Sequence, residues 1–384
     1  MTQIEQPWLT DPATQAVCNA VMADGAQALF VGGCVRNALL GVPVSDLDIA
    51  TDAPPETVVA LAKRAGIKAV PTGIDHGTVT LVENGVPFEI TTFRKDVATD
   101  GRRAVVAFST DIAEDAKRRD FTMNALYARP NGELVDPLGG LSDLKACRVR
   151  FIGTASHRIR EDYLRSLRYF RFHAWYGDAQ EGFDPDALAA IAENLDGLDT
   201  LSRERVGTEL LKLLGAPDPA PSVAVMRQIG MLAQLLPGAD DRALAPLVHL
   251  ESDLPADPIR RLTALGDKSV SSTLRLSKQQ LTRVEKLREA ATGTTAPSEL
   301  AYRLGADAAR DAVLLRAALL EQPVSTEIET EITAGASAKF PITAKDLMPK
   351  FSGPKLGAML KKLENEWIES GFVLGRDQLL ARAK

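Results

Sequence analysis

Two aspartates separated by one residue, Asp46 and Asp48, are the strongest sign of chemistry in the sequence. They alternate with Leu47 and Ile49, so in a β-strand both carboxylates point to one side while the apolar neighbours enter the core. Two like charges held together are costly without a cation, and hard oxygen ligands suit Mg²⁺. An isolated Asp-x-Asp pattern is also compatible with an ordinary polar strand face.

A third carboxylate, Glu89, lies on the polar side of a second predicted strand, opposite Phe88 and Ile90. Asp46, Asp48 and Glu89 would together form a two-metal site, in which metals about 3.5–4 Å apart bind the attacking and leaving oxygens of a phosphoryl transfer. We therefore expect the three side chains to converge on one rim of a sheet.

A paired-glycine turn precedes the aspartates, where an apolar strand runs into Gly32 and Gly33 and a short helical stretch follows. Such a turn lets backbone N–H groups approach a phosphate, and the helix N-terminus favours its negative charge. Arg36 would add a charge-assisted donor. Because tight strand-to-helix turns need no ligand, this signal is weak by itself.

The elements that must position these residues change character along the chain. Residues 27–140 alternate short β-rich runs with turn residues and helical patterns. Beyond about residue 150 the β signal disappears and apolar residues recur at helical spacing. We predict an α+β protein, a head with a mixed β-sheet followed by an all-helical neck, body and tail. The expected strands are 27–31, 46–51, 78–83, 88–92 and 133–136, and the expected helices are 55–65, 111–127, 160–176, 184–195, 202–214, 220–229 and 281–291.

Composition favours a cytoplasmic protein with no membrane partner. No apolar run approaches the roughly 20 residues needed to cross a bilayer, and the N-terminus shows neither a signal peptide nor a transit pattern. The three cysteines, Cys18, Cys34 and Cys147, are far apart and fit a reducing compartment. The net charge of -6 argues against a protein coated in nucleic acid, but residues 145–171 hold eight Lys and Arg against two acids.

The segment LFVGGCVR at 29–36, followed by the Asp-x-Asp pattern, resembles the nucleotidyltransferases of the DNA polymerase β superfamily. In more detail it resembles the class II tRNA nucleotidyltransferases (CCA-adding enzymes) and the bacterial poly(A) polymerases. Those enzymes carry Gly-Gly-x-Val-Arg-Asp, and Asn37 stands here in place of the last Asp. Asn also caps helices well, so we expect the site to remain functional. The resemblance implies Asp46 and Asp48 as ligands of Mg²⁺ and Glu89 as a further catalytic carboxylate.

Two further segments follow in the family's order. Residues 117–125 (KRRDFTMNA) resemble the motif that holds the ribose and phosphates, with Arg119 and Asp120 as the expected working residues. Residues 136–144 (DPLGGLSDL) resemble the hinge-like joint between head and neck. The order of the motifs makes the resemblance specific over the first half of the chain.

The segment at 160–171 resembles the motif that selects the incoming base. On one helix Asp162 and Arg165 would be three residues apart and share a face. A carboxylate and a guanidinium fork can pair with the exocyclic amine and ring nitrogen of cytosine or adenine, whereas uracil and guanine present the reverse pattern. The protein would then replace a template. The remaining expected nucleotide-binding residues are Arg168 and Arg171, and the expected supporting residues are Glu161, Arg203 and Glu204.

The resemblance implies an enzyme that adds CCA to the 3′ end of tRNA from CTP and ATP. One Mg²⁺ would activate the tRNA 3′-hydroxyl for attack on the α-phosphate, and a second would steady the departing pyrophosphate. The implied division is a nucleotidyltransferase head at 1–140, a nucleotide-selecting neck at 141–215, a body at 216–335 and a tRNA-contacting tail at 336–384.

A bacterial poly(A) polymerase, or an enzyme that adds only CC or only A, would share nearly all of these motifs. The polar segment at 94–104 resembles the family's flexible loop, linked to the change from CMP to AMP addition, and favours CCA synthesis; a plain exposed hairpin is the alternative. An inert tRNA-binding protein would need a broken metal site. A small-molecule nucleotidyltransferase would lack the long helical remainder.

Overall fold

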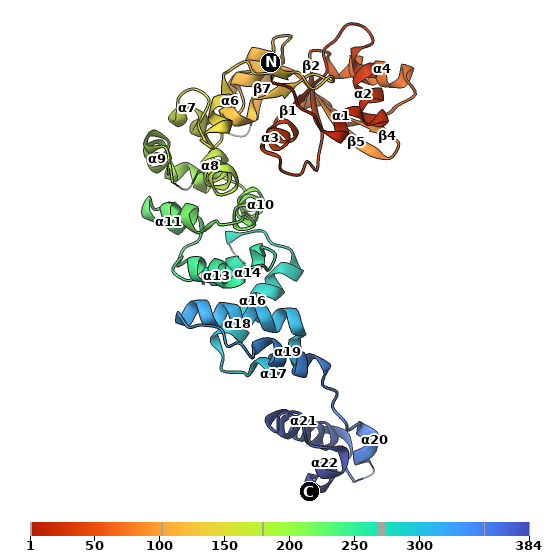
Figure 1. The fold of residues 1–384 in the computed structure, drawn as a ribbon, viewed down its shortest axis with the longest axis vertical. Helices are drawn as coiled ribbons and strands as arrows, with labels where there is room; N and C mark the ends of the chain where they lie inside the picture. Colours follow the sequence, from red (N-terminus) through yellow and green to blue (C-terminus); the bar gives the residue numbers. More distant parts are fainter. Residues whose placement is uncertain (1, 101–102, 179, 267–272, 349, 384) are drawn as a thin grey trace. The chain divides into compact units, whose positions relative to one another are not determined.

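The computed structural model describes residues 2–100, 103–178, 180–266, 273–348 and 350–383. The chain forms two compact units, Met1–Leu235 and Leu236–Lys384 (Figure 1). A mixed sheet lies in the first unit, and the described part of the second contains helices but no strand. The predicted α+β order, a mixed-sheet head followed by helices, is confirmed. The finer division at residues 140, 215 and 335 stays a prediction.

The main sheet has seven strands in the order β3-β4-β5-β2-β1-β8-β9. Strands β2 and β5 run parallel, and the other neighbouring pairs are antiparallel. Helices α2 (Pro12–Met22) and α4 (Pro55–Arg64) pack on the sheet (Figure 1). The strands are β1 (Leu29–Val31), β2 (Asp48–Thr51), β3 (Lys68–Gly73), β4 (Thr78–Glu83), β5 (Val86–Thr92), β8 (Tyr127–Ala128) and β9 (Leu134–Val135).

Strands β6 (Arg94–Asp100) and β7 (Arg103–Phe108) form a separate antiparallel pair. The segment at 94–104 is therefore a hairpin in its described part, as in the plainer of the two expectations, while residues 101 and 102 lie outside the described residues. Its link to the change from CMP to AMP addition stays a prediction. The sequence patterns had not identified β3 and β8.

The strand expected at 46–51 begins only at Asp48. On one side its partner β1 pairs Phe30 with Ile49 and then ends at the glycine turn. On the other side Asp48 pairs with Glu89, so continuing the register by two residues would place Asp46 opposite Pro87. Proline has no N–H to donate to a strand partner, and the pairing stops.

The helix expected at 111–127 is also shorter, because α5 spans only Ile112–Lys117. The backbone that follows pairs with a distant segment instead: the Thr122 N–H donates to the Arg150 carbonyl at 3.0 Å, and the Ile152 N–H donates to the Asp120 carbonyl at 3.0 Å. A short 3₁₀ turn, η2 (Thr122–Asn124), then leads into β8.

The expectation of one helix over residues 160–176 is wrong. Helix α7 (Ala155–Glu161) ends at Asp162, whose φ of -156° and ψ of 104° are extended. The Asp162 carboxylate accepts the N–H of Leu164 at 3.2 Å, and α8 (Leu164–Tyr176) starts there. An aspartate at this place begins a helix because its side chain satisfies an orphan N–H.

The other main helices of this unit are α3 (Gly33–Leu40), α6 (Gly140–Lys145), α9 (Pro185–Ala192), α10 (Arg203–Leu214), α11 (Ala220–Gln228) and α12 (Met231–Leu235).

The second unit packs its helices around several apolar cores, one of which surrounds Trp367 near the C-terminus. None of the helices in the described chain is both long and apolar enough to span a membrane. The unit's helices include α13 (Leu244–Glu251), α14 (Pro258–Ala264), α16 (Lys278–Thr292), α17 (Pro297–Leu304), α18 (Ala306–Leu320), α19 (Ile328–Ser337), α20 (Ala344–Leu347), α21 (Gly353–Glu369) and α22 (Arg376–Arg382).

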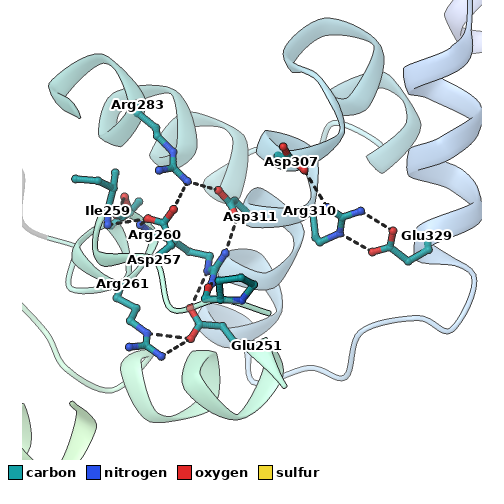
Figure 2. Close-up of polar contacts among 12 residues, drawn as sticks. Glu251, Asp257, Ile259, Arg260, Arg261, Arg283, Asp307, Arg310, Asp311 and Glu329 are labelled. Atoms are coloured by element: carbon teal, nitrogen blue, oxygen red, sulfur yellow. Dashed lines mark hydrogen bonds and ion pairs between the residues drawn. The ribbon is translucent and has the colours of Figure 1, made fainter. Parts of the chain in front are cut away.

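A buried ion network joins four of these helices (Figure 2). Arg260 donates to Glu251 at 2.7 Å and to Asp311 at 2.7 Å, and all three side chains are at most 7% exposed. Arg261 completes the coordination of Glu251, and Arg283 completes that of Asp311. Charges taken out of water are stable only when their partners are in place, so each member depends on the others.

We predict that Arg260→Met lowers the local opening free energy of α13 and α14 by about 3 kcal/mol, because it leaves two buried carboxylates without one of their cations. Hydrogen exchange of the backbone amides in these helices would then accelerate about a hundredfold. The matched control is Arg242→Met, since Arg242 is 85% exposed in its pair with Asp240 and such pairs contribute at most about 1 kcal/mol. Equal exchange in both variants would contradict a stabilising network.

Candidate active site

Asp48 and Glu89 stand side by side on two interior strands of the head sheet, where β2 begins. They are register partners on the parallel strands β2 and β5, so their side chains leave the same face of the sheet. Both residues are exposed, whereas Ile49 and Ile90, next to them, are buried. The alternation predicted from the sequence thus holds for these two acids and directs both carboxylates to one rim.

Asp46 lies just ahead of β2 and not on it. Its carboxylate is exposed and accepts the hydroxyl of Ser45 at 2.8 Å. The charge of Asp46 nevertheless acts on Asp48. The expectation that both aspartates share one strand face is therefore wrong, although the two acids remain close enough to interact electrostatically.

The carboxylates at this rim are not held in ion pairs within the described residues. None of Asp46, Asp48 and Glu89 forms an ion pair with any residue that the structure describes. Desolvation and then the charge of Glu89 raise the pKa of Asp48, with a further contribution from Asp46, while Arg119 opposes them. Excess negative charge of this kind fits a divalent cation.

The protein groups alone do not form a complete metal cage. No three His, Cys, Asp or Glu side chains within the described ranges are arranged to hold an ion together. Mg²⁺ sites of phosphoryl-transfer enzymes usually take one or two carboxylates from the protein and the remaining ligands from substrate phosphates and water. The rim of Asp48 and Glu89 matches this partial kind of site.

The glycine turn brings Arg119 to the same place. Gly32 has φ 72° and ψ -119°, a conformation that residues with a side chain avoid, and it directly precedes α3, whose first residue is Gly33. A Cβ atom at Gly32 would lie 3.5 Å from Nη1 of Arg119. Gly32, Arg119 and Asp48 therefore border one small region, where expected phosphate-binding and catalytic groups meet.

Arg36 is buried between head and neck. Its guanidinium donates to the side-chain oxygen of Asn37 at 2.9 and 3.1 Å and to the hydroxyl of Tyr176 at 2.8 Å, and it lies over the Tyr176 ring. The amide of Asn37 thus orients Arg36 from the position of the last aspartate in the family motif, but it adds no negative charge. Arg36 has no carboxylate hydrogen-bonded to it among the described residues.

Asp120 joins the head to α8. Arg168 donates to its carboxylate from Nε at 2.7 Å and also from a terminal nitrogen, and Asn124 donates at 3.0 Å. Burial alone would raise the pKa of Asp120, but the charge of Arg168 and these hydrogen bonds hold the pKa at about 2. Asp120 and Arg168 are therefore an ion pair at neutral pH, and the pair fixes the neck helix against the head.

Three arginines surround the ring of Phe172 on α8. The guanidinium carbons of Arg36, Arg168 and Arg171 lie 5.1, 5.4 and 4.5 Å from its centre. Arg171 is also paired with the buried Glu209 of α10. Three of the five expected nucleotide-binding arginines are thus clustered at the junction of head and neck, with an aromatic face that favours cations.

Asp162 and Arg165 do not share a helix face, contrary to the expectation. Asp162 lies in the break between α7 and α8, where Arg205 of α10 donates to it at 2.6 Å. Arg165 points to Glu161 and to the carbonyl oxygens of Arg158 and Arg118. The sharp turn that starts α8 separates the two side chains. Their predicted role in base selection stays a prediction.

The supporting contacts from α10 come from residues other than the expected Arg203 and Glu204. Arg205 and Glu209 contact Asp162 and Arg171, whereas the expected Arg203 and Glu204 lie exposed on α10. Glu161, also expected as a support, does hold Arg165. Arg205 and Glu209 are four residues apart and share one face of α10. This spacing was the available sequence signal for their supporting contacts.

The chain resembles known families in two segments. The model of the poly A polymerase head domain matches residues 28–150. The model described as a probable RNA and SrmB-binding site of polymerase A matches residues 182–242. The first match contains every head residue discussed above.

Similarity to individual proteins extends over nearly the whole chain. The mitochondrial CCA tRNA nucleotidyltransferase 1 of Homo sapiens is 33% identical over 379 residues, 92% of this chain and 86% of that protein. The CCA-adding enzyme of Streptococcus gordonii is 36% identical over 369 residues, 91% and 90% of the two chains. The crystal structure of the Bacillus stearothermophilus CCA-adding enzyme in complex with CTP superposes with a TM-score of 0.79 at 27% identity, covering 99% of this chain and 97% of that one.

We predict that Arg168→Met destabilises the first unit by about 3 kcal/mol at neutral pH, because it leaves the buried Asp120 carboxylate without its cation. A depressed pKa adds stability above the ordinary value near 4, and this stability is lost as the pH falls toward 2. The gap between wild type and variant in urea unfolding should therefore be widest at neutral pH and narrow below pH 4. The half-exposed pair of Arg129 with Glu133 provides the control, Arg129→Met. A gap that is independent of pH would contradict the assignment.

Proposed function

Because the chain belongs to the family of CCA-adding enzymes, the tRNA nucleotidyltransferases, we propose that it adds CMP and AMP residues from CTP and ATP to the 3′ end of tRNA. The protein itself selects the base, so no nucleic-acid template takes part. The observation that carries the proposal is the parallel pairing of Asp48 with Glu89 beside the Gly32 turn. This pairing gathers uncompensated negative charge where a nucleotide's phosphates have backbone and guanidinium donors within reach.

In this proposal Asp46, Asp48 and Glu89 hold Mg²⁺ at the sheet rim together with the nucleotide's phosphates. The cation supplies charge neutralisation and activates an oxygen nucleophile at neutral pH. The backbone at Gly32 and Gly33 receives the phosphates, and Arg119 faces the negative charge that develops as pyrophosphate leaves. Positioning and electrostatics then supply most of the rate, as is general for phosphoryl transfer.

Base selection is assigned to the neck. Asp162 presents an acceptor from the break before α8, and Arg165 presents a donor fork from the first turn of α8, so the two do not come from one helix face. Arg205 and Glu161 hold the two side chains. In cytosine or adenine, the exocyclic amine would donate to Asp162 and the ring nitrogen would accept from Arg165. Uracil and guanine present the reverse order of donor and acceptor, which would leave these polar groups unpaired.

The tail is the proposed contact for the tRNA elbow, through phosphate pairing with its lysines. All five of the tail's lysines that could contact phosphates are exposed, and Lys350 also donates to the Ala383 carbonyl at 2.7 Å; they are Lys345, Lys350, Lys355, Lys361 and Lys362. The three cysteines are free. Free thiols and a tRNA substrate agree with the proposed cytoplasmic location.

The function is tested by the lengths of the products. We predict that tRNAs ending before the CCA sequence, after its first C and after its second C are all extended to CCA when all four NTPs and Mg²⁺ are supplied, and no further. A poly(A) polymerase would add a longer A tract to every substrate. Products that stop at CC, or extension of only the CC-ending tRNA, would identify a CC-adding or an A-adding enzyme.

We predict that Asp48→Ala and Glu89→Ala each lower nucleotide addition on the order of a thousandfold or more, because they remove charge-stabilising groups at the reacting phosphate. The dissociation constant for tRNA should stay near that of the wild type, since phosphate contacts elsewhere carry RNA binding. Glu83→Ala, at the end of β4 in the same sheet, is the matched control. Full activity of either active-site variant would refute the assignment.

We predict that Arg205→Met relaxes base choice, so that misincorporation of UMP or GMP rises about tenfold relative to CMP, since Asp162 loses the contact that fixes it. The control Lys212→Met lies on the exposed side of the same helix. The measurement is the ratio of kcat/KM for each NTP. An unchanged ratio in the Arg205 variant would exclude a role of this contact in selection.

A further inference from the structure

A closed triangle of hydrogen bonds lies behind the active-site rim. The phenol of Tyr127 donates to Oδ2 of Asp115 at 2.7 Å and accepts Nε of Arg119 at 3.1 Å. Arg119 closes the triangle by donating from Nη2 to the same Asp115 oxygen at 3.1 Å. The remaining oxygen of Asp115 accepts Nε of Arg118 at 2.8 Å. Neither the carboxylate nor the phenol has a role in the chemistry derived above.

The triangle is built into the core of the head. Tyr127 is 0% and Asp115 1% exposed, and the Tyr127 ring belongs to the apolar cluster that includes Leu29 and Val31. Although burial opposes ionisation, the charges of Arg119 and Arg118 hold the pKa of Asp115 below its ordinary value. A buried charged group is costly, and well-packed apolar residues often serve stability as well. Stability alone therefore does not account for this arrangement.

The sheet fixes the phenol relative to the glycine turn. Tyr127 on β8 is the register partner of Val31 on β1, the residue immediately before Gly32. The side chain that anchors Arg119 is thus attached to the strand next to the one that carries the turn. Because β1 and β8 are hydrogen-bonded to each other, the Tyr127 phenol and the glycine turn keep a fixed relative position.

The guanidinium of Arg119 is held by one edge. Its Nε and Nη2 are engaged in the triangle, while Nη1 points to Gly32 and makes no hydrogen bond to a described residue. The charge of Arg119 also reaches Asp48. Because the guanidinium is planar, fixing Nε and Nη2 also fixes the direction of Nη1. Nη1 then points into the space between the glycine turn and the catalytic carboxylates.

We propose that Asp115 and Tyr127 are positioning residues, which fix Arg119 so that its free nitrogen meets the triphosphate of the incoming nucleotide beside Asp48. This inference rests on the proposed function, because it assumes that a nucleoside triphosphate binds at the turn. The residues act through Arg119 and touch no substrate themselves. Loss of the triangle leaves the sheet and the metal ligands in place but lets the guanidinium move.

The test uses Tyr127→Phe in the full-length enzyme, which removes one buried hydroxyl. Tyr169→Phe is the matched control, because Tyr169 is equally buried and its hydroxyl accepts only the Asp184 N–H at 2.9 Å within the described chain. We expect Tyr127→Phe to lower kcat/KM for both CTP and ATP about tenfold to a hundredfold, the usual cost of a misplaced binding group. The tRNA dissociation constant should not change, and the melting temperatures of the two variants should be similar.

A double-mutant cycle separates positioning from a general structural role. In the Arg119→Ala background, Tyr127→Phe should have no further effect on kcat/KM, because the phenol acts only through that guanidinium. Two results would overturn the inference. One is a double variant whose loss of kcat/KM equals the product of the two single losses, and the other is equal kinetics of Tyr127→Phe and Tyr169→Phe. A wild-type enzyme that adds no nucleotides would count against the proposed function instead.

A second pair of variants covers the case in which Tyr127→Phe does not fold. Asp115→Asn keeps the size of the side chain and one acceptor, and Asp143→Asn is its control, since Asp143 is 2% exposed and pairs with Arg150. The inference predicts that Asp115→Asn, and not Asp143→Asn, lowers kcat/KM for both CTP and ATP. The same loss in both Asn variants would contradict it.

Discussion

The parallel pairing of β2 with β5 is the constraint on which the active site depends. It sets Asp48 opposite Glu89, and neither residue can leave the rim without breaking the central sheet. The two strands are far apart in sequence, so sheet topology and not local geometry brings the acids together. Desolvation and then repulsion from Glu89 raise the pKa of Asp48. In the proposed function a cation offsets that repulsion, and the phosphates of a substrate complete its coordination.

Two consecutive residues connect this rim to the rest of the first unit. Arg119 faces the glycine turn and the carboxylates, while Asp120 faces Arg168 on the neck helix. The backbone beside them pairs with residues 150–152 and cannot continue as a helix. The positions of Arg168 and Arg119 are therefore set by the same short segment. In the proposed function this segment supports both nucleotide selection and nucleotide transfer.

Much of this could be predicted from the sequence where one residue pattern determines the structure locally. The alternation around Asp48 and Glu89 placed both acids on one face, and the glycine pair indicated the turn. The sequence did not show that Asp46 lies outside β2, because the start of this strand depends on Pro87 of its partner β5, which is distant in sequence. The break at Asp162 is a capping event that helical periodicity does not register. The count of eight Lys and Arg against two acids at 145–171 did not show that several of these side chains pair with acids outside the segment, namely Asp120, Asp143 and Glu209.

The central claim is that Asp48 and Glu89 form one cation-binding rim with the nucleotide's phosphates. The most direct measurement is anomalous diffraction from crystals of the enzyme with Mn²⁺ and an unreactive CTP analogue. The account predicts a manganese peak within coordination distance of the Asp48 carboxylate, with the analogue's phosphates between that peak and the turn at Gly32. A nucleotide bound with its phosphates elsewhere, or manganese that never contacts Asp48, would contradict it.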